Sequence, residues 1–406
     1  MSEDLTGKKE KKVEYVELIY DLIFVYVIGR NNLLLHSFSN GFVKPTAFNA
    51  YALCTLAVIQ IWNFSTYYIN VFGRHSIREH VFLFVNMFLM YFIGEGTRSD
   101  WQGYHTQYHV AWALILANIG IQYLIEMRGS ETVNKRQCVR MATVLLAEAA
   151  IVLGAIAEFS LHRTTWLSLA AVLFGMLAVV LISPKDVVFV DFPHLSERAM
   201  LYVVFTFGEM IISIASYFEG SFSVRSTYFA LMAFLIVVGL FLSYGMFYDH
   251  LIDREKKTNG LGYMFLHVFI IFAMNNITNS LEFMREEEIH LIPKLVFLLV
   301  SFAIYFIFLF AVGGRYAKVG CKRYPRFCLT VSVLGLIFTF LIFLFRNNMV
   351  FNIALSVVFV FSVFSMIYHY CRGADASAQE QRHLRPCNSD ISLRTLKTQK
   401  QQTMQC

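Results

Sequence analysis

Long apolar segments without charged side chains are the feature that most constrains this chain. The clearest of them, residues 295–312, reads LVFLLVSFAIYFIFLFAV and contains no charge. A helix needs about 20 such residues to cross the hydrocarbon core of a bilayer, and it satisfies its own backbone hydrogen bonds in lipid. Alternating segments of roughly ten residues would mark a membrane β-barrel, and the sequence lacks them. We therefore expect an all-α, polytopic integral membrane protein.

The composition agrees with this expectation. The 406 residues are 57% hydrophobic and only 15% charged, whereas a soluble domain carries about 25% charged residues. Apolar segments of suitable length predict about twelve transmembrane helices. They cover residues 16–37, 47–72, 79–95, 105–127, 137–159, 164–182, 196–218, 226–249, 260–281, 293–312, 327–345 and 349–371.

The orientation follows from the positive charges in the loops. Of the 34 Lys and Arg residues, 25 fall on the side of the N-terminus, 7 on the opposite side, and Arg30 and Arg198 within spans. Lys and Arg concentrate in cytoplasmic loops of membrane proteins. We therefore predict a multi-pass protein of the plasma membrane with both termini in the cytoplasm.

The same charge asymmetry indicates which binding partners to expect. The net charge of +6 favours contact with anionic lipid head groups of the bilayer, and no base-reading motif predicts a nucleic-acid partner. No motif predicts a cofactor, and the seven scattered cysteines contain no CxxC pair. Trp62, Trp101 and Trp112 are expected in the interfacial belts of the membrane.

The chain divides into four predicted parts. Residues 1–13 form a basic cytoplasmic tail, and residues 373–406 form a polar tail expected to be disordered. Between them, residues 14–195 and 196–372 form two six-helix halves. Because six is even, both halves would share one orientation, as in transporters built from parallel repeats.

Polar residues in the first span lie on one side of the predicted helix. At 100° per residue, Glu17, Asp21, Asn32 and His36 share a stripe of about 100°, with Arg30 on the opposite face. Charges are costly in hydrocarbon, so this stripe should face protein or water rather than lipid.

Two further spans hold carboxylates far from their ends. Arg198 and Glu209 project to nearly the same side of the seventh span. Glu148 lies near the middle of the fifth span, beside small residues such as Gly154 that allow close helix approach. Both glutamates are therefore expected near the middle of the membrane.

Five segments together resemble one known family. They are VELIYDLIFVYVIGR, WNFSTYY, HLSERAMLYVVFTFGEMIISIA, YGMFYDH and GYMFLHVFIIFAMNNI, in this order over about residues 14–280. They resemble signatures of the low-temperature-requirement A family of bacterial membrane proteins. Two positions depart from the family pattern: Phe207 stands where Leu is usual, and Met210 where Ser is usual.

The resemblance implies a role in growth in the cold but no settled biochemical activity. Transferred residue by residue, it draws attention to polar positions in or beside helices and to one glycine. These are Glu17, Asp21, Glu197, Arg198, Gly208, Glu209, Asp249 and His267.

The favoured hypothesis is a secondary transporter or permease for an unidentified small solute or ion. Carboxylates within the membrane can load and release a proton or cation, which makes Glu209 and Glu148 candidates for coupling. The structural alternative pairs Asp21 or Glu209 with Arg198 to hold the helices together. Candidates for gating or contact with the solute are Glu17, Asp21, Asn32, Glu197, Arg198, Asp249 and His267.

Two other classes remain open. A cation channel is one, because YDLIFVY resembles the Phe-Ser-Asp motif of a lysosomal-type potassium channel family, although no TVGYG-like filter follows. A membrane-embedded enzyme or lipid-handling protein is the other, because His105 and His109 have a spacing that can bind metal. No catalytic motif accompanies these histidines, so interface histidines are the better interpretation and no catalytic residue is assigned.

Overall fold

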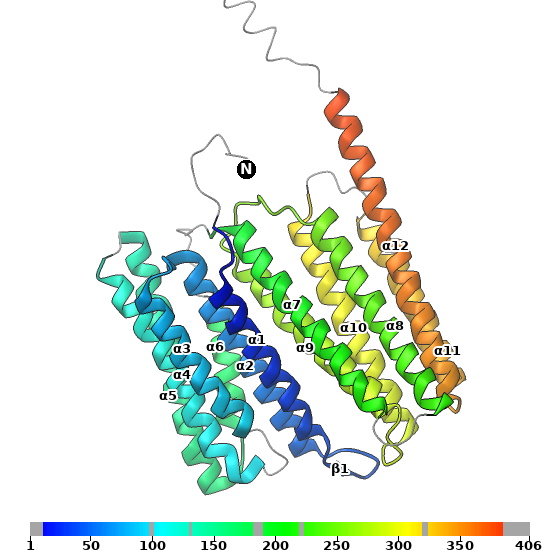
Figure 1. The fold of residues 1–406 in the computed structure, drawn as a ribbon, viewed down its shortest axis with the longest axis horizontal. Coiled ribbons are helices and arrows are strands. Elements are labelled where there is room, and N and C mark those ends of the chain that lie inside the picture. Colours follow the sequence, from blue (N-terminus) through cyan, green and yellow to red (C-terminus); the bar gives the residue numbers. More distant parts are fainter. Residues whose placement is uncertain are drawn as a thin grey trace, which may run out of the picture.

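The computed structural model describes residues 11–96, 101–129, 132–181, 190–218, 223–318 and 324–384. Within these ranges the chain is almost entirely helical, as Figure 1 shows. The helices are α1 (Tyr15–Asn31), α2 (Pro45–Phe72), α3 (Ile77–Gly96), α4 (Trp101–Met127), α5 (Thr132–His162), α6 (Trp166–Leu181), α7 (Phe192–Ile214), α8 (Val224–Met246), α9 (Leu261–Phe283), α10 (Leu291–Tyr316), α11 (Tyr324–Leu344) and α12 (Met349–Leu384).

Eleven of these helices are long and apolar enough to cross a membrane, and α6 is a shorter apolar helix. The prediction of an all-α, multi-pass membrane protein with about twelve spans is confirmed. Exposed side chains include many large apolar ones, such as Phe84 and Leu336. Such an exterior suits lipid rather than water.

The first predicted span, 16–37, matches the apolar helical segment Tyr15–Leu35, in which α1 itself ends at Asn31. A short 3₁₀ helix follows (η1, Asn32–Leu35), and then a two-stranded hairpin, β1 (Phe38–Ser39) with β2 (Phe42–Val43). Asn40 and Gly41 both have positive φ, the conformation that an Asn-Gly hairpin turn requires. His36 therefore lies outside α1, exposed, with Nε2 3.6 Å from Glu282 Oε1.

At the other end of the chain, α12 continues to Leu384 and so enters the segment predicted as a disordered tail. The remainder of that tail, like residues 1–10 of the basic tail, lies outside the described residues. Further short helical segments follow α7 (η2, Ala215–Phe218) and α8 (η3, Phe247–Leu251).

The helices α1, α2, α7 and α9 form the middle of the molecule. α1 packs against α2, α3 and α7, while α2 also contacts α4, α6, α7 and α9. In Figure 1, α3, α4 and α5 lie on one flank, and α8, α11 and α12 on the other. The start of α1 and the end of α12 lie on the same side, which we call the N-terminal side.

Two of the three tryptophans expected in interfacial belts are instead packed inside the bundle. Trp62 and Trp112 have no exposed surface. An indole ring is apolar apart from its N–H donor, so a buried tryptophan usually finds an acceptor. For Trp62 that acceptor belongs to the site described next.

Candidate functional site

A buried group of charges joins the beginnings of α1 and α7. We call it the charge cluster: Glu17 and Asp21 from α1 and Arg198 from α7. Arg198 donates from Nε to Asp21 Oδ2 (3.1 Å), from Nη2 to Asp21 Oδ1 (2.5 Å) and from Nη1 to Glu17 Oε2 (2.8 Å). Asp21 and Arg198 have no exposed surface and Glu17 only 2%. The planar fork of an arginine suits this bidentate contact.

Helical spacing explains how the cluster forms. Glu17 and Asp21 are four residues apart on α1, and His194 and Arg198 are four apart on α7, so each pair shares a face. Asp191 caps α7, because its side chain accepts a hydrogen bond from the backbone N–H of His194 at 3.2 Å. Two helix faces of opposite charge thus meet at one level of the bundle.

α2 completes the cluster with neutral side chains. Trp62 Nε1 donates to Asp21 Oδ1 at 2.7 Å. Asn70 Nδ2 lies 3.0 Å from His194 Nδ1, and hydrogen bonds to the backbone just before α7 fix the orientation of this amide. Since an amide nitrogen only donates, His194 Nδ1 accepts. The ring hydrogen is then on Nε2, which lies 3.3 Å from Glu17 Oε2.

Glu209 also faces α1, further along the same α1–α7 interface. A Cβ added to Gly29 would collide with the Glu209 carboxylate, so this glycine makes room for it. The carboxylate is half-buried and has no hydrogen-bond or ion-pair partner in the described part of the chain. Arg198 and Glu209 therefore share one side of α7, as predicted, but they are not paired with each other.

Glu148 is held between α2, α5 and α6. Its Oε2 accepts a hydrogen bond from Gln60 Nε2 at 3.1 Å, and the side chain has no exposed surface. A Cβ on Gly175 would overlap both partners, so only glycine allows α6 to approach this closely. Glu148 Oε1 has no partner within the described ranges.

A small, partly open cavity lies next to the two residues that contact this glutamate, Gln60 and Gly175. Gln60, Asn63, Gly175, Met264 and Phe265 are among its lining residues, which come from α2, α5, α6 and α9. The cavity offers about 40 Å³ to the centres of water molecules. One water needs roughly 10–15 Å³ by this measure, so the mostly apolar space is large enough for a few waters.

The remaining candidates lie elsewhere and are mostly satisfied. His267 Nδ1 contacts the carbonyl of Tyr263 (2.8 Å) and must donate to it, so Nε2 accepts from Tyr244 (3.0 Å). Asn32 accepts from Asn279 at 2.9 Å, where α9 approaches the end of α1.

Two acidic candidates lie nearer the surface, at the N-terminal side. Asp249 is exposed within η3. Glu197 is partly buried in the first turns of α7 and lies about 100° around the helix from Arg198. Neither joins the charge cluster.

The His105/His109 pair is stacked rather than convergent. The His105 ring lies 3.8 Å from both the His109 and Phe159 rings, centroid to centroid. Both ring nitrogens of His109 have hydrogen-bond partners. Nδ1 lies 2.7 Å from the His105 carbonyl oxygen, and Nε2 lies 2.7 Å from Ser168 Oγ. This arrangement favours a packing role for the pair over metal binding.

A depression at the opposite side of the molecule gathers positive charge. Its lining includes Arg225, Arg285, Lys294 and Arg346 together with Glu287. Four of the seven cations expected on the outer side thus line one hollow. Such a surface attracts anions toward the bundle.

Several residues of these sites were not identified as candidates from the sequence. Trp62 and His194 join the charge cluster, and Gln60 and Gly175 adjoin Glu148, although none was a candidate. Helical projection offers a signal for His194, because it falls four residues before Arg198 on the same face. Nothing comparable marks Gly175, whose role depends on a neighbouring helix.

Comparison with known proteins agrees with the resemblance seen in the sequence. The family model of the bacterial low temperature requirement A protein (LtrA) matches residues 12–366. The chain is also 22% identical over 215 residues to "Uncharacterized protein RA0937" of Rhizobium meliloti (strain 1021), a match covering 51% of this chain and 52% of that protein. The match thus spans about half the length of this relative. Because the family model covers most of the sequence, the chain belongs to the low temperature requirement A family of bacterial membrane proteins.

Proposed function

We propose that this protein is a secondary transporter or permease of the plasma membrane, with its N-terminal side in the cytoplasm. In this proposal a small solute moves with proton coupling, and Glu148 and Glu209 are the coupling groups. The observation that carries the proposal is a wholly buried Glu148 near a small cavity, with no cation to neutralise it among the described residues.

The chemistry around the cavity supports a proton or small cation. Gln60 Oε1, Asn63 Oδ1 and Glu148 Oε1 are buried acceptors without a donor in the described chain. An unsatisfied buried acceptor costs about 1–3 kcal/mol. A proton bound at Glu148 Oε1 converts one of these acceptors into a donor. Water or a cation in the cavity would satisfy the other two acceptors, Gln60 Oε1 and Asn63 Oδ1.

The charge cluster supports a different role within the same mechanism. Glu17 and Asp21 are both paired with Arg198, so we assign these three residues to holding α1 against α7 rather than to carrying the proton. Transporters alternate between states by moving helix groups around a fixed site. A strong contact at one end of the α1–α7 interface would let the end near Glu209 open and close.

The test is proton flux in proteoliposomes, reported by an internal pH dye while pools of candidate solutes are added. We expect solute-dependent flux in the native protein and its loss in Glu148→Gln. The variant Glu209→Gln should reduce the flux, because this carboxylate is also unpaired. Glu288→Gln, an exposed carboxylate, is the matched control and should leave the flux unchanged.

The other outcomes separate the alternatives. Flux that needs no solute would replace the transporter by a channel. Absence of flux in native protein that elutes as a folded species would overturn proton coupling. Lipid turnover or scrambling in the same vesicles would then identify an enzyme or lipid-handling protein.

A further inference from the structure

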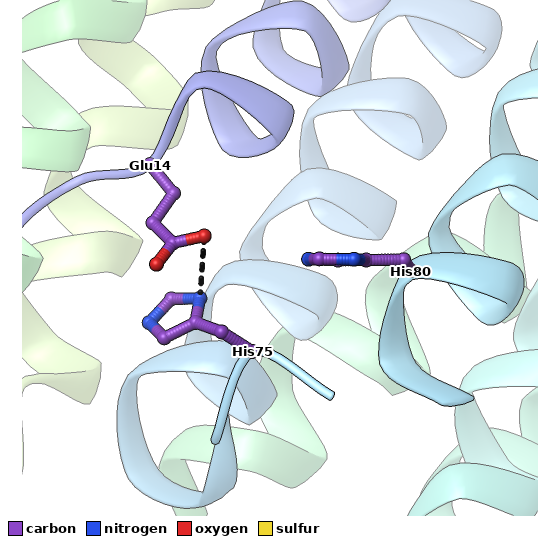
Figure 2. Close-up of side chains that lie close together, drawn as sticks. All are labelled: Glu14, His75 and His80. Carbon is purple, nitrogen blue, oxygen red and sulfur yellow. Dashed lines mark ion pairs between the residues drawn. The ribbon is translucent and has the colours of Figure 1, made fainter. Parts of the chain in front are cut away.

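A second group of potential ligands lies at the N-terminal side, outside the sites described above. Figure 2 shows Glu14, His75 and His80 converging from three segments: the residue before α1, the α2–α3 loop and the first turn of α3. Their ligand atoms all lie within 4.8 Å of one another. His75 Nδ1 is 3.2 Å from Glu14 Oε2.

These distances approach those around a bound metal ion. Zinc binds histidine nitrogen at about 2.0–2.1 Å and carboxylate oxygen at about 2.0–2.2 Å in a tetrahedron. Two ligand atoms on one such ion are then about 3.3 Å apart. The Glu14–His75 pair already has this separation. His80 has to approach by at most about 1.5 Å, which a side-chain rotation supplies.

The loop that carries His75 and the start of α3, which carries His80, are held in place before any ion binds. Ser76 and Glu79 form a capping box at the start of α3: the Glu79 N–H donates to Ser76 Oγ at 3.4 Å, and the Ser76 N–H to Glu79 Oε2 at 3.3 Å. Arg74 reaches Glu126 of α4 at 2.7 Å. Between them, His75 has a φ of 55°, an uncommon conformation for a non-glycine residue.

Two unpartnered atoms point to a missing ligand. His80 Nε2 is buried and has no hydrogen-bond partner in the part of the chain that the structure describes. The same holds for Glu17 Oε1, on a side chain only 2% exposed, which lies 4.0 Å from His75 Nδ1. A cation at the Glu14–His75–His80 group would supply what both atoms lack.

We propose that Glu14, His75 and His80 bind a divalent transition-metal ion, with Zn²⁺ the best match to two imidazoles and one carboxylate. Imidazole ligands select zinc and related metals, while magnesium and calcium prefer oxygen. Water or Glu17 Oε1 completes a tetrahedron. Glu14 and His75 are 36% and 28% exposed, so the ion has a path from solution.

Such an ion would cross-link separate segments of the chain. It would link the start of α1 to the α2–α3 loop and to α3, directly beside the charge cluster through Glu17. Any motion of α1 against its neighbours would then require stretching or breaking the metal site. The site is thus suited to regulate the protein by metal concentration, whatever the transported solute is.

The experiment uses the full chain, purified in detergent and stripped with a chelator. Zn²⁺ is titrated against a chromophoric competitor, and Co²⁺ is added separately to read the coordination geometry from its visible spectrum. We expect one ion per chain, a tetrahedral cobalt spectrum, a higher unfolding temperature with zinc, and no comparable effect of Mg²⁺.

Matched variants decide whether these residues are the ligands. Loss of one ligand should weaken zinc affinity at least about tenfold, since even outer-shell changes cost about 10–100-fold. We expect this for His75→Ala and His80→Ala, and no change for His162→Ala, an exposed histidine on α5. His80→Cys supplies another zinc ligand and should retain binding, with a new sulfur-to-cobalt charge-transfer band.

The proposal fails on two results. One is an absence of zinc binding at micromolar free metal in native protein that unfolds cooperatively. The other is binding that His75→Ala and His80→Ala leave intact. Because the readouts are affinity, spectrum and unfolding temperature, they stand apart from the flux assay that tests transport.

Discussion

At the scale of single residues, the buried carboxylates fall into two chemical situations. Glu17 and Asp21 are paired with Arg198, whereas Glu148 and Glu209 have no cationic partner within the described residues. Charged groups inside a membrane bundle are tolerated when paired and otherwise mark functional positions. This difference is why we propose anchoring for Glu17 and Asp21 and proton coupling for Glu148 and Glu209.

Replacing Arg198 should lower the unfolding free energy of the protein. Arg198→Gln leaves two buried carboxylates facing each other without a cation, and breaking a buried ion pair in this way costs about 3–5 kcal/mol. We expect a matching loss of unfolding free energy in detergent. Exposed Arg346→Gln is the control and should stay within about 0.5 kcal/mol.

A triple variant checks the origin of that loss. Replacing Glu17 and Asp21 by their amides together with Arg198→Gln removes all three charges. Much of the lost stability should return, because neutral side chains no longer need a buried counter-ion. A triple variant as unstable as Arg198→Gln would show that packing, not charge, holds the cluster.

At the scale of helices, glycines set how closely neighbours approach. Gly29 lets α1 accept the Glu209 carboxylate, and Gly175 lets α6 lie against the Gln60–Glu148 pair. The end of α2 is also held by a residue that precedes α1: Lys11 Nζ donates to the backbone carbonyls of Ile69 and Gly73. Burial lowers the pKa of this lysine. Small residues and terminal contacts of this kind guide helix association where lipid gives no hydrophobic drive.

Gly175→Ala tests the close approach of α6. The new methyl group overlaps Gln60 Nε2 and Glu148, and overpacking of this kind costs about 1–3 kcal/mol. We expect that loss in thermal unfolding together with reduced proton flux. Gly335→Ala on α11 meets no atom within 4 Å and should be neutral or slightly stabilising. Equal behaviour of the two variants would argue against the tight contact.

At the scale of the whole molecule, α1 begins and α12 ends on the same side. The proposed metal site and the charge cluster both lie on that side, and the depression lined by arginines lies on the other. Because Lys and Arg concentrate in cytoplasmic loops, we propose that the N-terminal side faces the cytoplasm. Metal sensing and gating would then respond to conditions inside the cell.

Fusions to the C-terminus measure this orientation. Green fluorescent protein joined after Cys406 should fluoresce in bacterial cells, because it folds in the cytoplasm, while alkaline phosphatase at the same point should stay inactive. A fusion in the loop between α10 and α11 should behave like the C-terminal one, and a fusion between α11 and α12 in the opposite way. Active phosphatase at the C-terminus would reverse the assignment.

The sequence by itself determined the helical membrane architecture, the family and the polar faces of α1 and α7, because span length and helical period are local properties. Glu17, Asp21 and Arg198 could therefore be identified from the residue pattern alone. Only the tertiary structure decided which faces meet: that Arg198 binds α1 and not Glu209, that Gly175 packs on Glu148, and that Glu14, His75 and His80 converge. Contacts between distant helices could not be read from the sequence. They depend on how all the side chains pack at once, and apolar surfaces in lipid carry little information about which helix lies beside which.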